Sequence, residues 1–305
     1  MPSDLPPSID PVAALRWAQR VQHDSPWLHE EVGRRMQERL QWIKQAPGSW
    51  VDWEPVRGGL QAHAAITRRY PQARCHVVEA LAANAQRVRE TLLAPWWRRL
   101  PWCQVTPHFG PPGDGAVQMV WANMALHMSA DPQALIALWH RWLAVDGFLM
   151  FSCLGPDSLR ELRDACRAHG LPPPAHEFTD MHDWGDMLVH SGFAEPVMDM
   201  ERITLTFDSP LRALRELREL GRNLNISRFP ALRGRGWHTQ LEQLMLAHGP
   251  GEVALPRRVA MTFEIIYGHA IKPARRLTVK GETVLSLEEM RRVLTKGVAG
   301  PDNQP

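Results

Sequence analysis

Two acidic residues and a glycine-ended turn near the start of the chain have the spacing of a nucleoside-binding site. The turn DWEPVRGG runs from Asp52 to two glycines, Gly58 and Gly59, and the second acid, Glu79, follows 27 positions after Asp52. In a doubly wound α/β sheet, glycines in the first turn let the backbone approach a ligand, and an acid that ends the second strand accepts hydrogen bonds from ribose hydroxyls. On these residues alone, Glu79 is equally compatible with a solvated charge at a strand end.

Short apolar runs alternate with helical patterns along the chain. This alternation is typical of the α/β sheets in which such a turn connects a strand to a helix. Strands are predicted at SWVDW (49–53), CHVVEA (75–80), AVQMVWAN (116–123), GFLMFSCL (147–154), PVMDMERITLTF (196–207) and VAMTFEIIYGHA (259–270). Helices are predicted at 60–69, 81–93, 132–143, 159–169, 181–191 and 211–220, with one or two more between 11 and 44. The sequence therefore predicts a doubly wound, mostly parallel α/β sheet with an antiparallel edge and added helices.

These patterns divide the chain into three parts. Residues 1–45 are predicted to form N-terminal helices, and residues 46–273 the sheet domain, with a helical insertion at about 208–248. Residues 274–305 are predicted to form a basic, flexible tail. No internal repeat interrupts this division.

The composition argues against several classes of protein. Basic and acidic residues nearly balance, at 35 and 33, so no nucleic-acid partner is expected, and no apolar run approaches the roughly 18 residues of a membrane span. The first ten residues lack the basic and apolar regions of a signal peptide, which predicts a cytoplasmic protein. The four cysteines (Cys75, Cys103, Cys153 and Cys166) show no metal-ligand spacing and are expected to be buried, reduced thiols.

Four long blocks of the second half resemble a known family. They are VWANMALHM, LWHRWLAVDGFLMFSCLGPDSLRELR, FTDMHDWGDMLVHSGFAEPVMDMERITLTF and FEIIYGHAIKP, within a match from about Val120 to Pro273. They look like blocks of the malonyl-acyl-carrier-protein O-methyltransferases, a family of class I S-adenosylmethionine-dependent methyltransferases. The resemblance implies a class I fold and esterification of the free carboxyl of a malonyl thioester, the step that starts the pimeloyl chain of biotin.

The same resemblance implies a set of cofactor-binding residues. Asp52 and Gly58 fall on the acidic and last-glycine positions of the family's first turn, and Gly59 follows them. Glu79 matches the family's ribose-binding acid. Asn123, Met124 and Ala125 match the segment after the fourth strand that faces cofactor and substrate.

The first turn also departs from the family pattern. The family has three alternating glycines after the acid, and here Glu54 and Val56 occupy the first two of these positions. Their side chains are expected to intrude where the methionine and ribose parts of the cofactor lie close to the backbone. The block VTPHFGPPGDG (105–115) replaces one in which the family commonly has an acidic residue near the adenine. Binding of S-adenosylmethionine is therefore expected to be weak, altered or lost.

A basic region is the predicted contact for an acidic acyl carrier protein. Between Glu201 and Lys280 there are 14 basic and 7 acidic residues. Arg228, Arg233 and Arg235 lie in a Gly/Pro-rich stretch predicted to be a loop, and they are the candidates for contact with the carrier or with the malonyl carboxylate. Four further arginines at helical spacing (212, 215, 218 and 222) are instead predicted to form a solvated helix face paired with neighbouring glutamates.

His127, His182 and Tyr267 lie in the resembling blocks and are the candidates for lining the substrate pocket. A carboxylate is already an anion near neutral pH, so its methylation needs alignment with the methyl group and no strong base. These residues are therefore predicted to line the pocket without acid–base roles. Packing or helix capping is the alternative for the histidines.

Three functions stay open at this point. The first is an active S-adenosylmethionine-dependent methyltransferase for a malonyl thioester on a carrier. The second is a catalytically inactive relative that keeps the fold and binds a carrier or another protein. The third is methyl transfer to another small carboxylate or hydroxyl. Cofactor affinity separates the second function from the other two.

Overall fold

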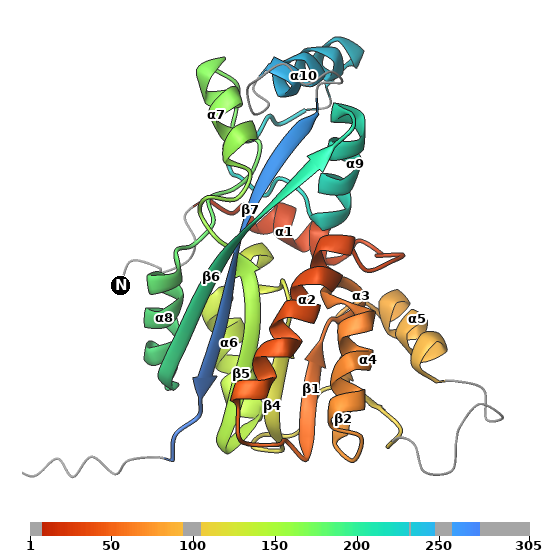
Figure 1. The fold of residues 1–305 in the computed structure, drawn as a ribbon, viewed down its shortest axis with the longest axis vertical. Coiled ribbons are helices and arrows are strands. Elements are labelled where there is room, and N and C mark those ends of the chain that lie inside the picture. Colours follow the sequence, from red (N-terminus) through yellow and green to blue (C-terminus); the bar gives the residue numbers. More distant parts are fainter. Residues whose placement is uncertain (1–7, 94–104, 232, 248–257, 275–305) are drawn as a thin grey trace, which may run out of the picture. The chain divides into compact units, whose positions relative to one another are not determined.

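The structure, a computed structural model, describes residues 8–93, 105–231, 233–247 and 258–274 (Figure 1). Within these ranges seven strands form one sheet with the order β3-β2-β1-β4-β5-β7-β6. The strands are β1 (Ser49–Trp53), β2 (Arg74–Val78), β3 (His108–Phe109), β4 (Val117–Ala122), β5 (Leu143–Leu154), β6 (Ala194–Phe207) and β7 (Val259–Ile271). Strands β1 to β5 pair in parallel, and β7 pairs antiparallel with both β5 and β6. The predicted parallel sheet with an antiparallel edge is confirmed.

The alternation of side chains along the strands builds a core on each face of the sheet. In β1, Trp50 packs into one core and Val51 into the other. In β5, Phe148 and Leu149 divide in the same way. Both faces of a parallel sheet must be covered because its strands are apolar on both sides. Residues of α2, α4 and α5 complete the first core, and residues of α6 and α8 complete the second.

The helices fall close to their predicted positions. They are α1 (Pro11–Ala18), α2 (Trp27–Arg39), α3 (Pro55–Gly58), α4 (Leu60–Arg69), α5 (Ala82–Leu92), α6 (Pro132–Trp142), α7 (Arg160–Ala168), α8 (Met181–His190), α9 (Pro210–Leu220) and α10 (Arg235–Ala247). Short 3₁₀ turns follow α2 at Leu40–Trp42 and β4 at Leu126–Met128. None of the helices in the described parts is long and apolar enough to cross a membrane.

The long antiparallel pair β6 and β7 carries a helical group at one end. Helices α7, α9 and α10 pack around this end, in the upper part of Figure 1. Helix α7 contacts β7, α9 contacts β6, and α10 contacts both of these helices. Two of them, α9 and α10, lie in the stretch predicted as a helical insertion. The predicted loop was wrong at its end, because Arg235 begins α10. The predicted tail lies outside the described residues from 275 onward.

The other differences are local. Strand β5 begins at Leu143, four residues before the predicted start. Its pairing with β4 shifts register in this region, so the strand continues through the predicted turn at Asp146 and Gly147. A two-residue strand, β3, lies inside the predicted Pro/Gly-rich loop. The predicted thiols Cys75, Cys153 and Cys166 are buried and free, as expected. Cys103 lies outside the described residues.

Candidate active site

A cavity of about 390 Å³ lies at the carboxyl ends of β1 and β4, and we call it the strand-end cavity. The chain runs outward from β1 to β3 on one side and from β4 to β5 on the other, so the cavity marks the point where strand order reverses. Doubly wound sheets bind ligands at this point. The residues that line it come from α1, α2, the ends of β1 and β4, α6 and α9; among them are Trp17, His29, Trp53, Glu54, Arg57, Asn123, Met124, Ala125, Met128, Asp131, Glu219 and Leu220.

The first turn is folded as one tight helical turn. Glu54 takes a left-handed conformation (φ 49°), and its carbonyl accepts the N–H of Gly58 at 2.8 Å. Pro55 begins α3, and the turn directs the Val56 side chain into the first core, where it is fully buried. The expectation that Val56 intrudes into the ligand site was therefore wrong, because α3 points it into the protein. Glu54 does line the cavity.

Replacement of Val56 by glycine tests this placement. We expect Val56→Gly to lower the free energy of unfolding by about 2–3 kcal/mol, because it removes a buried side chain and adds a flexible residue to a helical turn. The midpoint of urea unfolding measures the change. Val189→Gly, at a half-exposed position of α8, is the matched control and should cost under about 1 kcal/mol. Equal losses in the two variants would contradict the core position of Val56.

Glu79, at the end of β2, holds the first turn. Its Oε1 accepts the Val56 N–H at 2.9 Å, so the acid and the turn form one unit. Burial raises the pKa of Glu79 to about 8, and the negative charges of Glu54 and Asp52 add to the rise. Glu79 is not among the residues that line the strand-end cavity. Its predicted contact with ribose stays a prediction.

The raised pKa of Glu79 makes stability depend on pH. Between about pH 4.3, where an unfolded glutamate ionises, and about pH 8, the folded protein keeps a proton that the unfolded chain has released. The folded state therefore loses stability as pH rises through this window. We expect Glu79→Gln to remove the loss, so that the variant gains about 1–3 kcal/mol over the wild type between pH 5 and pH 8. Urea unfolding at several pH values measures this, and a difference that does not change with pH would contradict it.

The other predicted residues of the first turn make contacts inside the protein, and their predicted cofactor contacts stay predictions. Asp52 is buried, and its Oδ2 lies 2.7 Å from Nδ1 of His63 on α4. Burial raises the pKa of Asp52, and the hydrogen bond to His63 opposes the rise. A Cβ on Gly58 would lie 3.3 Å from the Asn123 carbonyl oxygen, so this glycine lets the turn approach the end of β4. Gly59 has φ +124°, which favours glycine. None of these three predicted cofactor residues lines the cavity.

Asn123 joins the elements around the site. Its Nδ2 donates to the carbonyl of His29 at 2.7 Å and also to the carbonyl of Gly58. Its Oδ1 accepts from Oγ of Ser152 at 2.6 Å, and that hydroxyl accepts the Met124 N–H at 3.0 Å. The side chain thus fixes α2, the first turn and β5 to the end of β4. Asn123, Met124 and Ala125 line the cavity, and their predicted contact with the cofactor stays a prediction.

Two residues that the sequence pattern did not indicate also line the cavity. The Arg57 guanidinium donates to the carbonyls of residues 17, 18 and 20 and lies 4.8 Å from the Trp17 ring centroid. Nδ1 of His29 lies 2.7 Å from the Arg57 carbonyl and therefore carries the hydrogen. Burial lowers the pKa of His29 to about 4, so its ring is neutral. No sequence signal marks His29, because it lies on a separate helix 23 positions before Asp52.

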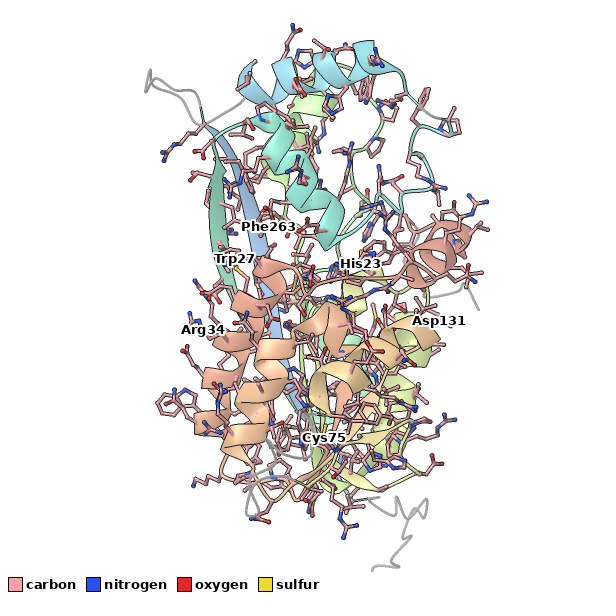
Figure 2. The ribbon with its side chains drawn as sticks, turned by 90° about the vertical axis from the view of Figure 1, so that its right-hand side faces the viewer. His23, Trp27, Arg34, Cys75, Asp131 and Phe263 are labelled. Carbon is pink, nitrogen blue, oxygen red and sulfur yellow. The ribbon has the colours of Figure 1, made fainter. Side chains whose placement is uncertain are left out.

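A second cavity, of about 360 Å³, lies among α7, α9 and α10, and we call it the helical cavity. Its lining is mostly apolar and includes Leu154, Leu159, Leu162, Phe178, Leu214, Leu217, Trp237, Leu241 and Phe263. Four arginines add positive charge: Arg218, Arg222, Arg228 and Arg233. Figure 2 shows Phe263 on β7 at the level where α9 packs. Met128 and Leu220 line both cavities, so the two adjoin.

Three of the predicted substrate residues line the helical cavity. His127 is buried there, and burial lowers its pKa well below the ordinary value. Arg228 pairs with Asp10 at 2.6 Å, and the Arg233 guanidinium lies 3.5 Å from the Trp237 ring centroid. The structure thus brings together one histidine and two arginines that the resemblance and the charge pattern singled out separately.

The other three predicted substrate residues lie elsewhere. His182 is exposed near the start of α8, and Arg235 is exposed at the start of α10; neither lines the strand-end cavity or the helical cavity. Tyr267 donates its hydroxyl to Glu201 at 2.6 Å and lines a third cavity beside α2. The structure does not bring these residues to the junction of the two cavities.

Two crystal structures share the fold. A candidate methyltransferase from Bacillus halodurans C-125 superimposes with a TM-score of 0.51 at 15% identity, over 78% of this chain and 99% of its own. The YcgJ protein of Bacillus subtilis also gives 0.51, at 12% identity, over 79% of this chain and 99% of its own. At these identities the likeness concerns the fold alone, and it confirms the predicted class I methyltransferase fold.

Sequence relatives place the chain more closely. A protein of Gallionella capsiferriformans (strain ES-2) named malonyl-[acyl-carrier protein] O-methyltransferase is 36% identical over 85% of this chain and 88% of its own length. Proteins of the same name from Laribacter hongkongensis and Legionella pneumophila are 36% and 31% identical, over 82% and 83% of this chain. No profile of a known protein family matches the sequence. On these relatives, the chain belongs to the malonyl-[acyl-carrier protein] O-methyltransferase family.

Proposed function

We propose that this protein transfers a methyl group from S-adenosylmethionine to the free carboxyl of a malonyl thioester carried by an acyl carrier protein. The observation that carries the proposal is the contact between the two cavities. The strand-end cavity lies at the ligand position of the fold, and the helical cavity adjoins it at Met128 and Leu220. A methyl donor in the first and an acyl group in the second would meet at this junction.

The strand-end cavity fits the amino-acid end of the donor. Two of its lining residues each keep one buried nitrogen without a partner among the described residues: Nε2 of His29 and Nε of Arg57. The first is an acceptor, since Nδ1 carries the hydrogen, and the second is a donor. Such a pair complements the ammonium and carboxylate groups of an amino acid. Bound S-adenosylmethionine would supply the methyl group from its sulfonium.

The helical cavity supports the acceptor side of the proposal. Its apolar walls would exclude water around the thioester arm, and its arginines would attract the carrier and pair with the malonyl carboxylate. The carboxylate oxygen then forms a bond to the methyl carbon while the carbon–sulfur bond breaks and its electron pair stays on sulfur. No proton moves in this step, so the buried histidines need only shape and align the site. We assign the reaction to biotin synthesis in the cytoplasm.

The experiment is a methylation assay with the full chain, S-adenosylmethionine and malonyl-loaded carrier protein. We expect the loaded carrier to gain the mass of one methyl group. Acetyl-loaded carrier, which lacks the free carboxyl, is the control and should not react. Absence of product together with absence of donor binding at millimolar concentration would favour the inactive relative. Donor binding without methylation of the carrier would favour a different acceptor.

One arginine pair tests the assignment of the helical cavity. We expect Arg233→Gln to raise the KM for malonyl-loaded carrier about 5- to 20-fold and to weaken its dependence on salt, because Arg233 lines the cavity. Arg235→Gln removes the same charge two positions away, outside the cavity, and should change KM less than about twofold. Steady-state rates at two ionic strengths measure both variants. Equal effects would show that the region acts by general charge and not through this cavity.

A further inference from the structure

The wall of the strand-end cavity contains a carboxylate where the family pattern has a glycine. We infer that Glu54 makes this protein select the methyl donor over its demethylated product, by placing a negative charge beside the site of the donor's sulfonium. The inference rests on the proposed function, because it concerns the ligand of the same cavity. On this inference, the acid at a glycine position of the family gives the cavity its selectivity for the donor.

The geometry leaves the Glu54 charge without a close partner. Its side chain is only 19% exposed, and burial raises the pKa of its carboxyl. The one ion pair that the described residues give it, with Arg57 at 3.6 Å, opposes this rise. The Arg57 guanidinium is itself engaged by three carbonyl groups at the end of α1. A carboxylate removed from water and weakly paired gains most from a cation that enters its cavity.

Two further acids, Asp52 and Glu79, lie near the first turn. The charges of Glu54 and Asp52 contribute to the raised pKa of Glu79, about 8, so Glu79 keeps its proton near neutral pH and adds no charge of its own. Each of them has its own partner, since Asp52 bonds to His63 and Glu79 accepts the Val56 N–H. Glu54 is the member of this group that lines the cavity.

An independent feature of the wall points to the same ligand. The His29 side chain is 4% exposed and lines the cavity, and its Nε2 presents a lone pair with no hydrogen-bond partner among the described residues. With Nε of Arg57, it accounts for the ammonium and carboxylate groups, which donor and product share. The sulfonium charge is present only in the donor. The wall holds two other carboxylates, Asp131 and Glu219, but both are exposed to solvent. The largely buried Glu54 is therefore the acid that can distinguish the two ligands.

The backbone of Glu54 supports a functional origin for this residue. Its φ of 49° is a conformation that glycine adopts freely and that costs another residue of the order of 1 kcal/mol. The position thus has a backbone conformation that suits glycine, although it carries an acid. Core packing does not offset this cost, because Glu54 lines the cavity and is not part of the core.

The experiment compares two ligands by calorimetry on the full chain. S-adenosylmethionine and S-adenosylhomocysteine are titrated into the wild type, Glu54→Gln and Glu54→Gly. We expect the wild type to bind the donor more tightly than the product, and the ratio of their Kd values to fall about tenfold in both variants, or about 1.4 kcal/mol. Glu219→Gln, an exposed carboxylate on the same cavity, is the matched control and should leave the ratio unchanged.

The outcomes separate the inference from the proposed function. If the wild type binds both ligands and the ratio is unchanged in the Glu54 variants, the inference is overturned and the proposed function stands, even where both affinities fall together. If the wild type binds neither ligand at millimolar concentration, both are overturned. Glu54→Gly guards against a folding defect in Glu54→Gln, because glycine accepts the left-handed backbone without strain.

Discussion

Gly268→Ala should prevent this protein from reaching its native fold or lower its free energy of unfolding by more than about 3 kcal/mol. Gly268 lies in β7 directly opposite Phe151 of β5. A Cβ at this position would overlap the edge of the Phe151 ring at Cε1 and Cζ, and Cδ1 of the same ring would lie only 2.9 Å away. Both residues are buried between paired strands, so the ring cannot move aside without shifting the sheet. Urea unfolding of the purified variant, or its recovery in the soluble fraction, measures the effect.

Two further variants isolate the cause. Gly185→Ala, in the middle of α8, should stabilise the protein by about 0.5–1 kcal/mol, because alanine favours a helix and a Cβ there would meet open space. Phe151→Leu combined with Gly268→Ala should be more stable than Gly268→Ala alone, because it removes the ring edge. If the double variant is no better than the single one, the conflict with Phe151 is not the reason for the glycine.

Asn123→Ala should lower the free energy of unfolding by about 3–4 kcal/mol and abolish binding of the methyl donor. The change leaves the carbonyls of His29 and Gly58 and the hydroxyl of Ser152 without their partner in a buried site. Each unpaired buried group costs about 1–3 kcal/mol, and partial relaxation reduces the sum. The same bonds hold the first turn and α2 against the end of β4, so their loss widens the strand-end cavity. Urea unfolding and calorimetry with S-adenosylmethionine measure the two effects.

A matched asparagine provides the control for Asn123. The Asn223 side chain donates to the Pro173 carbonyl at 2.7 Å and accepts the Asn225 N–H at 2.9 Å, in a partly exposed loop. Asn223→Ala should cost about 1 kcal/mol or less, because water can replace the lost partners. Donor binding that survives in Asn123→Ala at wild-type strength would show that the network supports the fold without shaping the cavity.

The sequence predicted the elements well because their signals are local. The periodicity of 60–69 placed α4 at Leu60–Arg69, and the apolar run SWVDW placed β1 at Ser49–Trp53. The two elements that the sequence did not predict also have physical explanations. The two-residue strand β3 is too short to show a pattern, and α10 begins in a glycine-containing stretch that its later residues override.

In the first turn, the place of a residue in the sequence motif did not predict where its side chain points. Glu54 and Val56 both occupy places where the family has glycine, and sequence spacing treated them alike. The turn of α3 separates them, because it sends Val56 into the core and leaves Glu54 on the cavity. Likewise Gly58 is required by the Asn123 carbonyl beside it, which comes from 65 positions further along the chain.

By itself, then, the sequence determined the fold, the family and the order of the elements, because periodicity and the long blocks of family resemblance depend on residues that are close together in the chain. Only the tertiary structure decided which side chains share a cavity. It brought His29 from α2 and Arg57 from α3 together at the strand ends, and it placed Tyr267 and His182 away from that junction. The physical reason is that a side chain's direction depends on the helix or strand that carries it and on what packs against it, and these contacts join residues far apart in the chain.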